Sequence, residues 1–170
     1  DTDTVVVNFY EDALSEGLTF DSYNPNGFVV GSEETENDYG TVIQVVKTGA
    51  TGNFYIVAAD DGFDISPYQA QGELVFDLNV VSSAGGVELY VKFDSGWPNV
   101  SDYSVTLPTT GEWAEVRISV SDILANGNSF VNGTADVFDL ANIFVVEPTG
   151  VMTFKLDNVR LEIPGTAAPD

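Results

Sequence analysis

The sequence predicts an all-β fold, an antiparallel β-sandwich or jelly roll. Short runs in which apolar and polar residues alternate recur along the whole chain, as in strands with one buried face. Clusters of turn-forming residues separate these runs. No stretch keeps the apolar spacing of a helix over the length of an ordinary helix. Many short strands joined by frequent turns are typical of a two-layered antiparallel domain.

The N-terminal third is expected to contribute four strands. In the first strand, Val5, Val7 and Phe9 share one face. A polar loop with the strong turn signal Asn-Pro-Asn-Gly at 24–27 follows, and the acidic stretch at 33–40 also has the composition of a loop. The expected strands are residues 4–10, 28–30, 41–47 and 53–59. The last two have the pattern of a hairpin around a Gly-rich turn.

After a loop at 60–71, a regular strand is expected at 72–81. The even-numbered residues from Leu74 to Val80 are apolar and are expected to face the core. Asp77 and Asn79 have the other parity and are expected to face outward.

The stretch from Val87 to Val120 contains the most informative pattern. Residues 87–94 alternate so that Tyr90 and Lys92 share the outward face of a strand. A loop then places Trp97 between a glycine and a proline. Because loops lie at the surface and bury a large ring with difficulty, Trp97 is expected to be exposed. Further strands are expected from the runs 103–107 and 113–120.

The C-terminal part is expected to hold one short helical turn and two strands. The segment 121–127 begins with a capping serine and ends with glycine. Strands are expected at 142–147 and 151–163. Within the last strand the apolar residues change parity after Asp157, which predicts a β-bulge there. Residues 164–170 have the composition of a linker, so the predicted domain is residues 1–163.

The composition excludes several classes of function. The chain has 170 residues, with 44% hydrophobic residues and no cysteine or histidine. It is therefore long enough for one domain with its own core, and thiol or imidazole chemistry is excluded. With 27 acidic and 5 basic residues, its net charge is −22. Such a surface repels nucleic acids, anionic membranes and anionic polymers.

The same charge suits a protein that works in salt water, where screening weakens self-repulsion. No apolar run approaches the roughly 20 residues that span a bilayer, and Asp1 is not followed by a leader-like segment. The charge and the low number of lysines lead us to expect a secreted domain from a saline habitat, monomeric when isolated.

Three motifs in the C-terminal half resemble, in order, those of jelly-roll carbohydrate-binding modules. They are WAEVRISV at 113–120, SDI at 121–123 and LDNVRL at 156–161. Residues 89–101 more narrowly resemble the C-terminal module of bacterial family 3 exo-β-glucanases. The resemblance covers residues 75–161 and implies a galactose-binding-domain-like sandwich that binds a polysaccharide without cleaving it.

The resemblance also implies a structural calcium ion. In such modules a glutamate after the first strand and the aspartate of the closing motif often bind Ca²⁺, and these positions are Glu11 and Asp157 here. Asp38 is an additional candidate. Calcium takes about 6–8 oxygen ligands, which carboxylates supply. The alternative is that Glu11 is a solvated acid and that Asp157 caps a turn.

A sugar site needs a flat aromatic face and polar groups for the hydroxyls. Trp97 is the expected aromatic residue. If their strands are neighbours, the polar residues that face outward line the same site: Tyr90, Lys92, Asp77, Asn79 and Arg117. Cross-strand packing of Tyr90 and ion pairing of Lys92 and Arg117 remain alternatives. Trp113 is expected to pack within the fold, whereas the roles of Tyr39, Tyr55, Tyr68 and Tyr103 stay open.

The sequence thus predicts a non-catalytic carbohydrate-binding module, covalently linked to a secreted glycoside hydrolase. The expected ligand is a neutral glycan, since the net charge disfavours anionic ones. The resemblance favours a laminarin-type β-1,3-glucan or a mixed-linkage β-glucan, and agarose or another neutral marine glycan is the second choice. An alternative is a structural accessory domain that stabilises a catalytic neighbour and binds no glycan.

Overall fold

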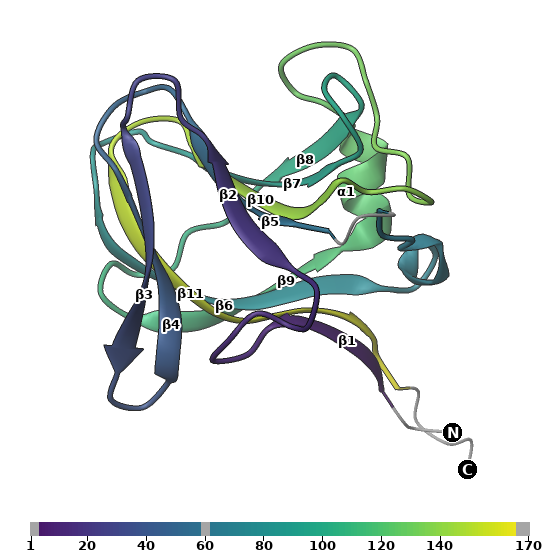
Figure 1. Cartoon of the computed structure of the whole chain (residues 1–170), viewed down its shortest axis with the longest axis horizontal. Coiled ribbons are helices and arrows are strands. Elements are labelled where there is room, and N and C mark those ends of the chain that lie inside the picture. Colours follow the sequence, from purple (N-terminus) through teal and green to yellow (C-terminus); the bar gives the residue numbers. More distant parts are fainter. Residues whose placement is uncertain (1–3, 59–61, 166–170) are drawn as a thin grey trace.

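Two antiparallel sheets pack face to face in the computed structural model, which describes residues 4–58 and 62–165. Figure 1 shows the two layers, with β6, β9 and β11 in one and β5, β7 and β10 in the other. The predicted all-β sandwich is confirmed. The predicted tail at 164–170 lies largely outside the described residues. No helix in the described ranges has the length and apolar character needed to cross a membrane.

The first sheet has the strand order β3-β4-β11-β6-β9, with β1 paired to one end of β11. Its strands are β1 (Val5–Tyr10), β3 (Val29–Glu36), β4 (Gly40–Lys47), β6 (Glu73–Ser83), β9 (Trp113–Ser119) and β11 (Met152–Ile163). The second sheet has the order β2-β5-β10-β7-β8. Its strands are β2 (Thr19–Tyr23), β5 (Asn53–Val57), β7 (Leu89–Asp94), β8 (Val100–Ser104) and β10 (Asn142–Pro148).

In the part of the chain that the structure describes, two short helices connect the strands. The 3₁₀ helix η1 (Ser66–Tyr68) lies between β5 and β6, and α1 (Val120–Asn126) follows β9. The short helical turn expected at 121–127 is therefore confirmed. The helix α1 contacts β8 and β9 at one end of the sandwich (Figure 1).

The core lies between the two sheets. The even-numbered residues of β6 from Leu74 to Val80 are buried there, as their alternation predicts. Phe76 packs edge-on against Phe144 of the opposite sheet, with ring centroids 5.3 Å apart. Burial of such large apolar side chains is the main favourable contribution to folding.

The hairpin predicted from residues 41–47 and 53–59 is wrong, because β4 and β5 lie in different sheets. Two edge strands also differ from the prediction. The acidic stretch at 33–40, expected to be a loop, forms the end of β3 and the turn after it. The strand β2 forms within a stretch that is also expected to be a loop. Both strands lie at sheet edges, where charged side chains stay in water and oppose pairing with another chain.

The predicted irregularity in the last strand is present. The pairing of β11 with β6 shifts register between Asp157 and Arg160, and Asn158 has a positive φ of 53°. The shift lets both halves of β11 bury their apolar residues. It also turns Asp157 toward the register partner Asp77, on the outer face of the first sheet.

Candidate binding groove

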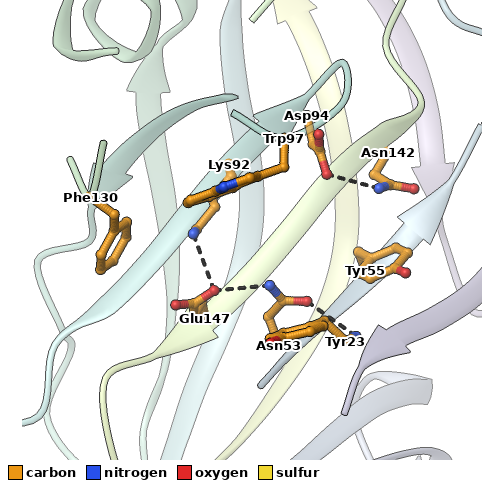
Figure 2. A pocket seen from close by; sticks show the side chains of 9 residues that line it. All are labelled: Tyr23, Asn53, Tyr55, Lys92, Asp94, Trp97, Phe130, Asn142 and Glu147. Atoms are coloured by element: carbon orange, nitrogen blue, oxygen red, sulfur yellow. Dashed lines mark hydrogen bonds and ion pairs between the residues drawn. The ribbon is translucent and has the colours of Figure 1, made fainter. Parts of the chain in front are cut away.

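A groove with a volume of about 650 Å³ lies on the outer face of the second sheet. Its residues come from β2, β5, β7 and β10 and from the loops that follow β7 and α1. Figure 2 shows these side chains converging above the strands. The lining residues are Tyr23, Asn53, Tyr55, Lys92, Asp94, Trp97, Phe130, Asn142 and Glu147.

Strand alternation explains why these side chains share one face. In β5, Phe54 and Ile56 are buried in the core, so Asn53 and Tyr55 point into the groove. In β10, Asn142 and Glu147 have opposite parity. A register shift between Asn142 and Val145 brings both to the groove side.

A charged network forms one part of the groove floor. The Lys92 ammonium lies 3.1 Å from the Glu147 carboxylate, and only 4% of the Lys92 side chain is exposed. The Asn53 side-chain amide donates a hydrogen bond of 2.9 Å to the same carboxylate oxygen (Figure 2). A buried cation requires such a partner because desolvation of an unpaired charge is costly.

Two aromatic rings stand over this cation. The Lys92 ammonium lies 4.5 Å from the centroid of the Phe130 ring and 5.7 Å from that of Trp97. Both distances are within the range of cation–π attraction. The rings nevertheless face solvent, since 59% of Trp97 and 48% of Phe130 are exposed. The expectation that Trp97 is exposed is therefore confirmed.

A second polar pair lies at the base of the Trp97 loop. The Asn142 amide donates to one oxygen of Asp94 at 2.9 Å (Figure 2). The other oxygen of Asp94 accepts a 2.7 Å hydrogen bond from the backbone N–H of Gly96. Asp94 thus belongs to the groove and also anchors the loop that carries Trp97.

Tyr55 and Tyr23 complete the groove from β5 and β2. Burial, followed by the negative charges of Asp21 and Asp94, raises the pKa of the Tyr55 phenol. Its hydroxyl therefore stays protonated and can donate a hydrogen bond. Tyr23 is 56% exposed and offers a further aromatic surface. The groove therefore combines accessible ring faces with hydrogen-bonding groups. This combination suits a ligand that has both apolar faces and hydroxyl groups.

The structure brings together part of the predicted sugar site. Trp97 and Lys92 line the groove. Tyr90 lies next to it, because it shares the outward face of β7 with Lys92 and its ring centroid is 5.4 Å from that of Phe130.

The other three predicted residues do not reach the groove. Asp77 and Asn79 belong to β6 and Arg117 to β9. These strands pair with each other in the first sheet, whereas β7 lies in the second. The condition that all three strands are neighbours is therefore not met. Arg117 instead forms ion pairs with glutamates, as the alternative allowed: Glu73, Glu115 and Glu162.

Seven groove residues are not among the predicted site residues. One of them is Tyr55, whose role the sequence leaves open, and the others are Tyr23, Asn53, Asp94, Phe130, Asn142 and Glu147. Alternation in the expected strand at 53–59 gives a signal for Asn53 and Tyr55, but it does not say which sheet contains that strand. The bulge in β10 and the loop of Phe130 have no comparable sequence signal.

The predicted calcium ligands differ in their exposure. Glu11 and Asp38 are exposed, whereas Asp157 is 1% exposed. Burial is the main cause that raises the pKa of Asp157, and the charges of Asp12 and Asp77 raise it further. Within residues 4–58 and 62–165, no group of three or more acidic side chains has a spacing suited to a metal ion. A preformed site made by the three predicted ligands is therefore not present, and calcium binding stays a prediction that rests on Asp157.

Comparison with protein families gives one match. The model of the family described as carbohydrate binding domain 30 matches residues 8–162, which is most of the chain. No sequence among curated proteins matches significantly. The resemblance to carbohydrate-binding modules is thus confirmed.

Solved structures of the same fold support this match. The family 30 module of a cellulosomal cellulase of Clostridium thermocellum is 14% identical, with a TM-score of 0.66 and coverage of 98% of this chain and 99% of that chain. A family 11 module of the same organism, in complex with a β-1,3-1,4-mixed-linked tetrasaccharide, is 20% identical, with a TM-score of 0.61 and coverage of 96% and 98%. The extra C-terminal domain of an exo-1,3/1,4-β-glucanase of a Pseudoalteromonas species is 9% identical, with a TM-score of 0.64 and coverage of 94% and 93%. At these identities the likeness shows the fold.

Proposed function

The chain belongs to the carbohydrate binding domain 30 family, and from this premise we propose that it binds a neutral β-glucan in the groove of its second sheet. The observation that carries the proposal is the exposed ring of Trp97 beside Phe130, above a floor of hydrogen-bonding groups. The C–H faces of a pyranose stack on such rings, and its hydroxyls need polar partners.

The shape of the groove suits a single glycan chain. Tyr23 lies on β2 and Lys92 on β7, with β5 and β10 between them. Three strand spacings correspond to about 14 Å, so the groove has room for a short oligosaccharide laid across the strands. Rings that rise on one side of a polar floor favour a separate chain over the flat surface of a crystal.

Charge favours a neutral ligand. The groove itself contains Asp94 and Glu147. Lys92, the only cation among the described residues that line it, is already paired with Glu147. Together with the net charge of −22, these carboxylates repel uronic acids and sulfated sugars. A mixed-linkage β-glucan is our first choice and a laminarin-type glucan the next, because one similar module holds a mixed-linked tetrasaccharide and another belongs to an exo-1,3/1,4-β-glucanase.

The module is proposed to act without catalysis, as a monomer linked to a secreted glycoside hydrolase. Its role is to hold the enzyme on its substrate, which raises the local concentration of cleavable bonds. The acidic surface supports this role in a saline habitat and argues against nucleic-acid or membrane partners.

Titration calorimetry tests the proposal. Mixed-linkage β-glucan, laminarin, cello-oligosaccharides, agarose and alginate are titrated into the wild type and into Trp97→Ala. We expect heat with β-glucan, none with alginate, and at least a tenfold loss of affinity in Trp97→Ala, as for an aromatic hot spot. Phe138→Ala is the matched control, since Phe138 is 67% exposed but does not line the groove.

Two results would redirect the assignment. If agarose is the one glycan that gives binding heat, the ligand of the groove is a neutral glycan other than a β-glucan. Absence of heat with every glycan would contradict binding and favour a structural accessory domain, while reducing ends released by the isolated domain would contradict its non-catalytic role.

We further propose that a calcium ion binds near Asp157 and stabilises the fold. The support is the buried carboxylate of Asp157 close to the charges of Asp12 and Asp77, since a cation would offset their repulsion. The predicted ligands Glu11 and Asp38 are exposed and would have to approach it. We expect the melting temperature to rise with millimolar Ca²⁺ and to fall with chelator. Asp157→Asn should abolish this response, and a wild type that ignores Ca²⁺ contradicts the proposal.

A further inference from the structure

Two loops that are distant in sequence lie against each other at one side of the groove. The loop at 95–99 carries Trp97, and the loop at 127–135 carries Phe130. Figure 1 shows the two segments side by side above β8. Their backbones are in direct contact, since a Cβ atom at Gly133 would overlap the carbonyl oxygen of Pro98.

One side chain, that of Asn128, bonds to both loops. Its amide oxygen accepts hydrogen bonds from the backbone N–H groups of Phe130 (2.9 Å) and Val131 (3.2 Å). Its amide nitrogen donates a 3.0 Å hydrogen bond to the carbonyl oxygen of Pro98. Two donors on one side and an acceptor on the other fix the orientation of the amide. The two contacted backbones include Phe130 itself and the neighbour of Trp97.

The base of the Phe130 loop is held separately. The buried carboxylate of Asp102 on β8 accepts hydrogen bonds from the N–H (2.9 Å) and hydroxyl (2.5 Å) groups of Ser129, and from the amide of Asn126 (2.9 Å). A further link joins the loop bases, since the N–H of Asp136 donates to the hydroxyl of Ser95 at 2.8 Å. Loss of the Asn128 amide would therefore leave both loops attached to the sheet and remove the side-chain link between their tips.

We propose that Asn128 is a positioning residue that fixes the spacing between the Trp97 and Phe130 rings before ligand arrives. This inference rests on the proposed function of the groove. Rings that already hold their positions lose less conformational freedom on binding, and a preorganised site therefore binds more tightly. Asn128 acts through the two rings.

Two substitutions separate the two halves of the link. Asn128→Asp keeps an oxygen acceptor for Phe130 and Val131 but replaces the donor to Pro98 with an oxygen that repels its carbonyl. It should release the Trp97 loop alone. Asn128→Ala removes both halves. The control for added charge is Asn132→Asp, because Asn132 is exposed in the same loop.

The first measurement needs no ligand. In ¹⁵N-labelled protein, the heteronuclear NOE of the Trp97 indole N–H reports motion of the ring on the picosecond-to-nanosecond scale. We expect it to fall in Asn128→Asp and Asn128→Ala and to stay unchanged in Asn132→Asp. An unchanged value in Asn128→Asp, folded as judged by its melting curve, overturns the inference.

The second measurement is affinity for a mixed-linkage tetrasaccharide. Asn128→Asp should weaken binding about three- to tenfold, the cost of ordering one large side chain. In a Trp97→Ala background the same substitution should have no effect, because the ring through which it acts is absent. An equal loss in both backgrounds overturns the positioning role. If the wild type binds no glycan, the proposed function fails, whereas the NOE result still decides whether Asn128 holds the loop.

Discussion

At the scale of single residues, Lys92 joins the polar floor of the groove to its aromatic wall. Its ammonium is paired with Glu147 and lies under the rings of Phe130 and Trp97. The cation therefore has two roles, since it neutralises a carboxylate in the groove and attracts both rings from below.

The first prediction concerns this pair. Lys92→Met leaves the Glu147 carboxylate without its cation and should lower the free energy of unfolding by about 1–3 kcal/mol. Adding Glu147→Gln should recover part of that loss, since the uncompensated charge is then removed. Urea denaturation of the two single variants and the double variant measures the coupling. Additive losses would mean that the ion pair contributes nothing of its own.

Residue patterns predict part of the site and miss the rest for identifiable reasons. Trp97 can be identified because its loop composition alone implies exposure. Asn142 and Glu147 could not be predicted together, because simple alternation places them on opposite faces of β10. The bulge between Asn142 and Val145 brings both to the same face. Asp77 and Asn79 are wrongly assigned to the site because alternation shows which residues share a face of one strand but not which strands are neighbours.

At the scale of elements, the two sheets approach each other closely where β3 passes β5. A Cβ atom at Gly31 of β3 would overlap the ring of Phe54 on β5. Because Phe54 is only 7% exposed and packs against Phe20 at a centroid distance of 5.3 Å, it has little room to move. Phe54 also precedes Tyr55 of the groove, so this contact supports the groove from the core side.

The second prediction tests that contact. Gly31→Ala should destabilise the fold by about 1–3 kcal/mol, because an added methyl group overpacks a filled region. Gly85→Ala is the control, since a Cβ there meets no atom within 4 Å. Thermal unfolding of both variants provides the comparison. Equal melting temperatures would show that β3 shifts to accommodate the methyl group without cost.

The central strands could be predicted from sequence, whereas the edge strand β2 and most of the edge strand β3 could not. The apolar alternation of β6 and β11 reflects burial that is strong enough to mark both strands and the bulge at Asp157. The strands β2 and β3 lie at sheet edges with mostly exposed side chains. Their composition resembles that of loops because backbone pairing with a neighbour, which composition does not reveal, holds them in place.

At the scale of the whole molecule, a net charge of −22 lowers the stability of the folded state. Mutual repulsion of the carboxylates opposes the compact state and weakens with salt. The buried carboxylate of Asp157 also destabilises the folded state when it is charged. Its pKa is raised in the folded protein above the ordinary value of 3.8, so the stability associated with it is complete below that ordinary value and is lost as pH rises through its folded value.

The third prediction follows from these two contributions. In calcium-free buffer, the melting temperature should rise as pH falls from neutral through the folded pKa of Asp157, which lies above 3.8. The pKa of Glu162 is lowered through its hydrogen bonds with Arg160 and Arg117. Ionised Glu162 therefore stabilises the fold, and this stabilisation is lost only when the pH falls below the ordinary range of a glutamate. High salt, about 0.5 M, should remove the part due to surface repulsion. The remainder belongs to buried Asp157 and should disappear in Asp157→Asn.

A flat pH profile in the wild type at low salt would contradict both contributions. Salt gives a further contrast, since binding of a neutral glucan should not depend on ionic strength, whereas binding of any charged glycan would.

The two sides of the groove differ in how they are attached to the fold. Trp97 and Phe130 stand on loops that Asn128 ties together, so a shift in the backbone of one loop reaches the other. Tyr23 stands alone on the edge strand β2, whose outer side has no neighbouring strand in the sheet. In the proposed β-glucan site, variation at position 23 would therefore change which linkage fits while the opposite side keeps its geometry. Protein engineers seeking new ligands for this module would begin there.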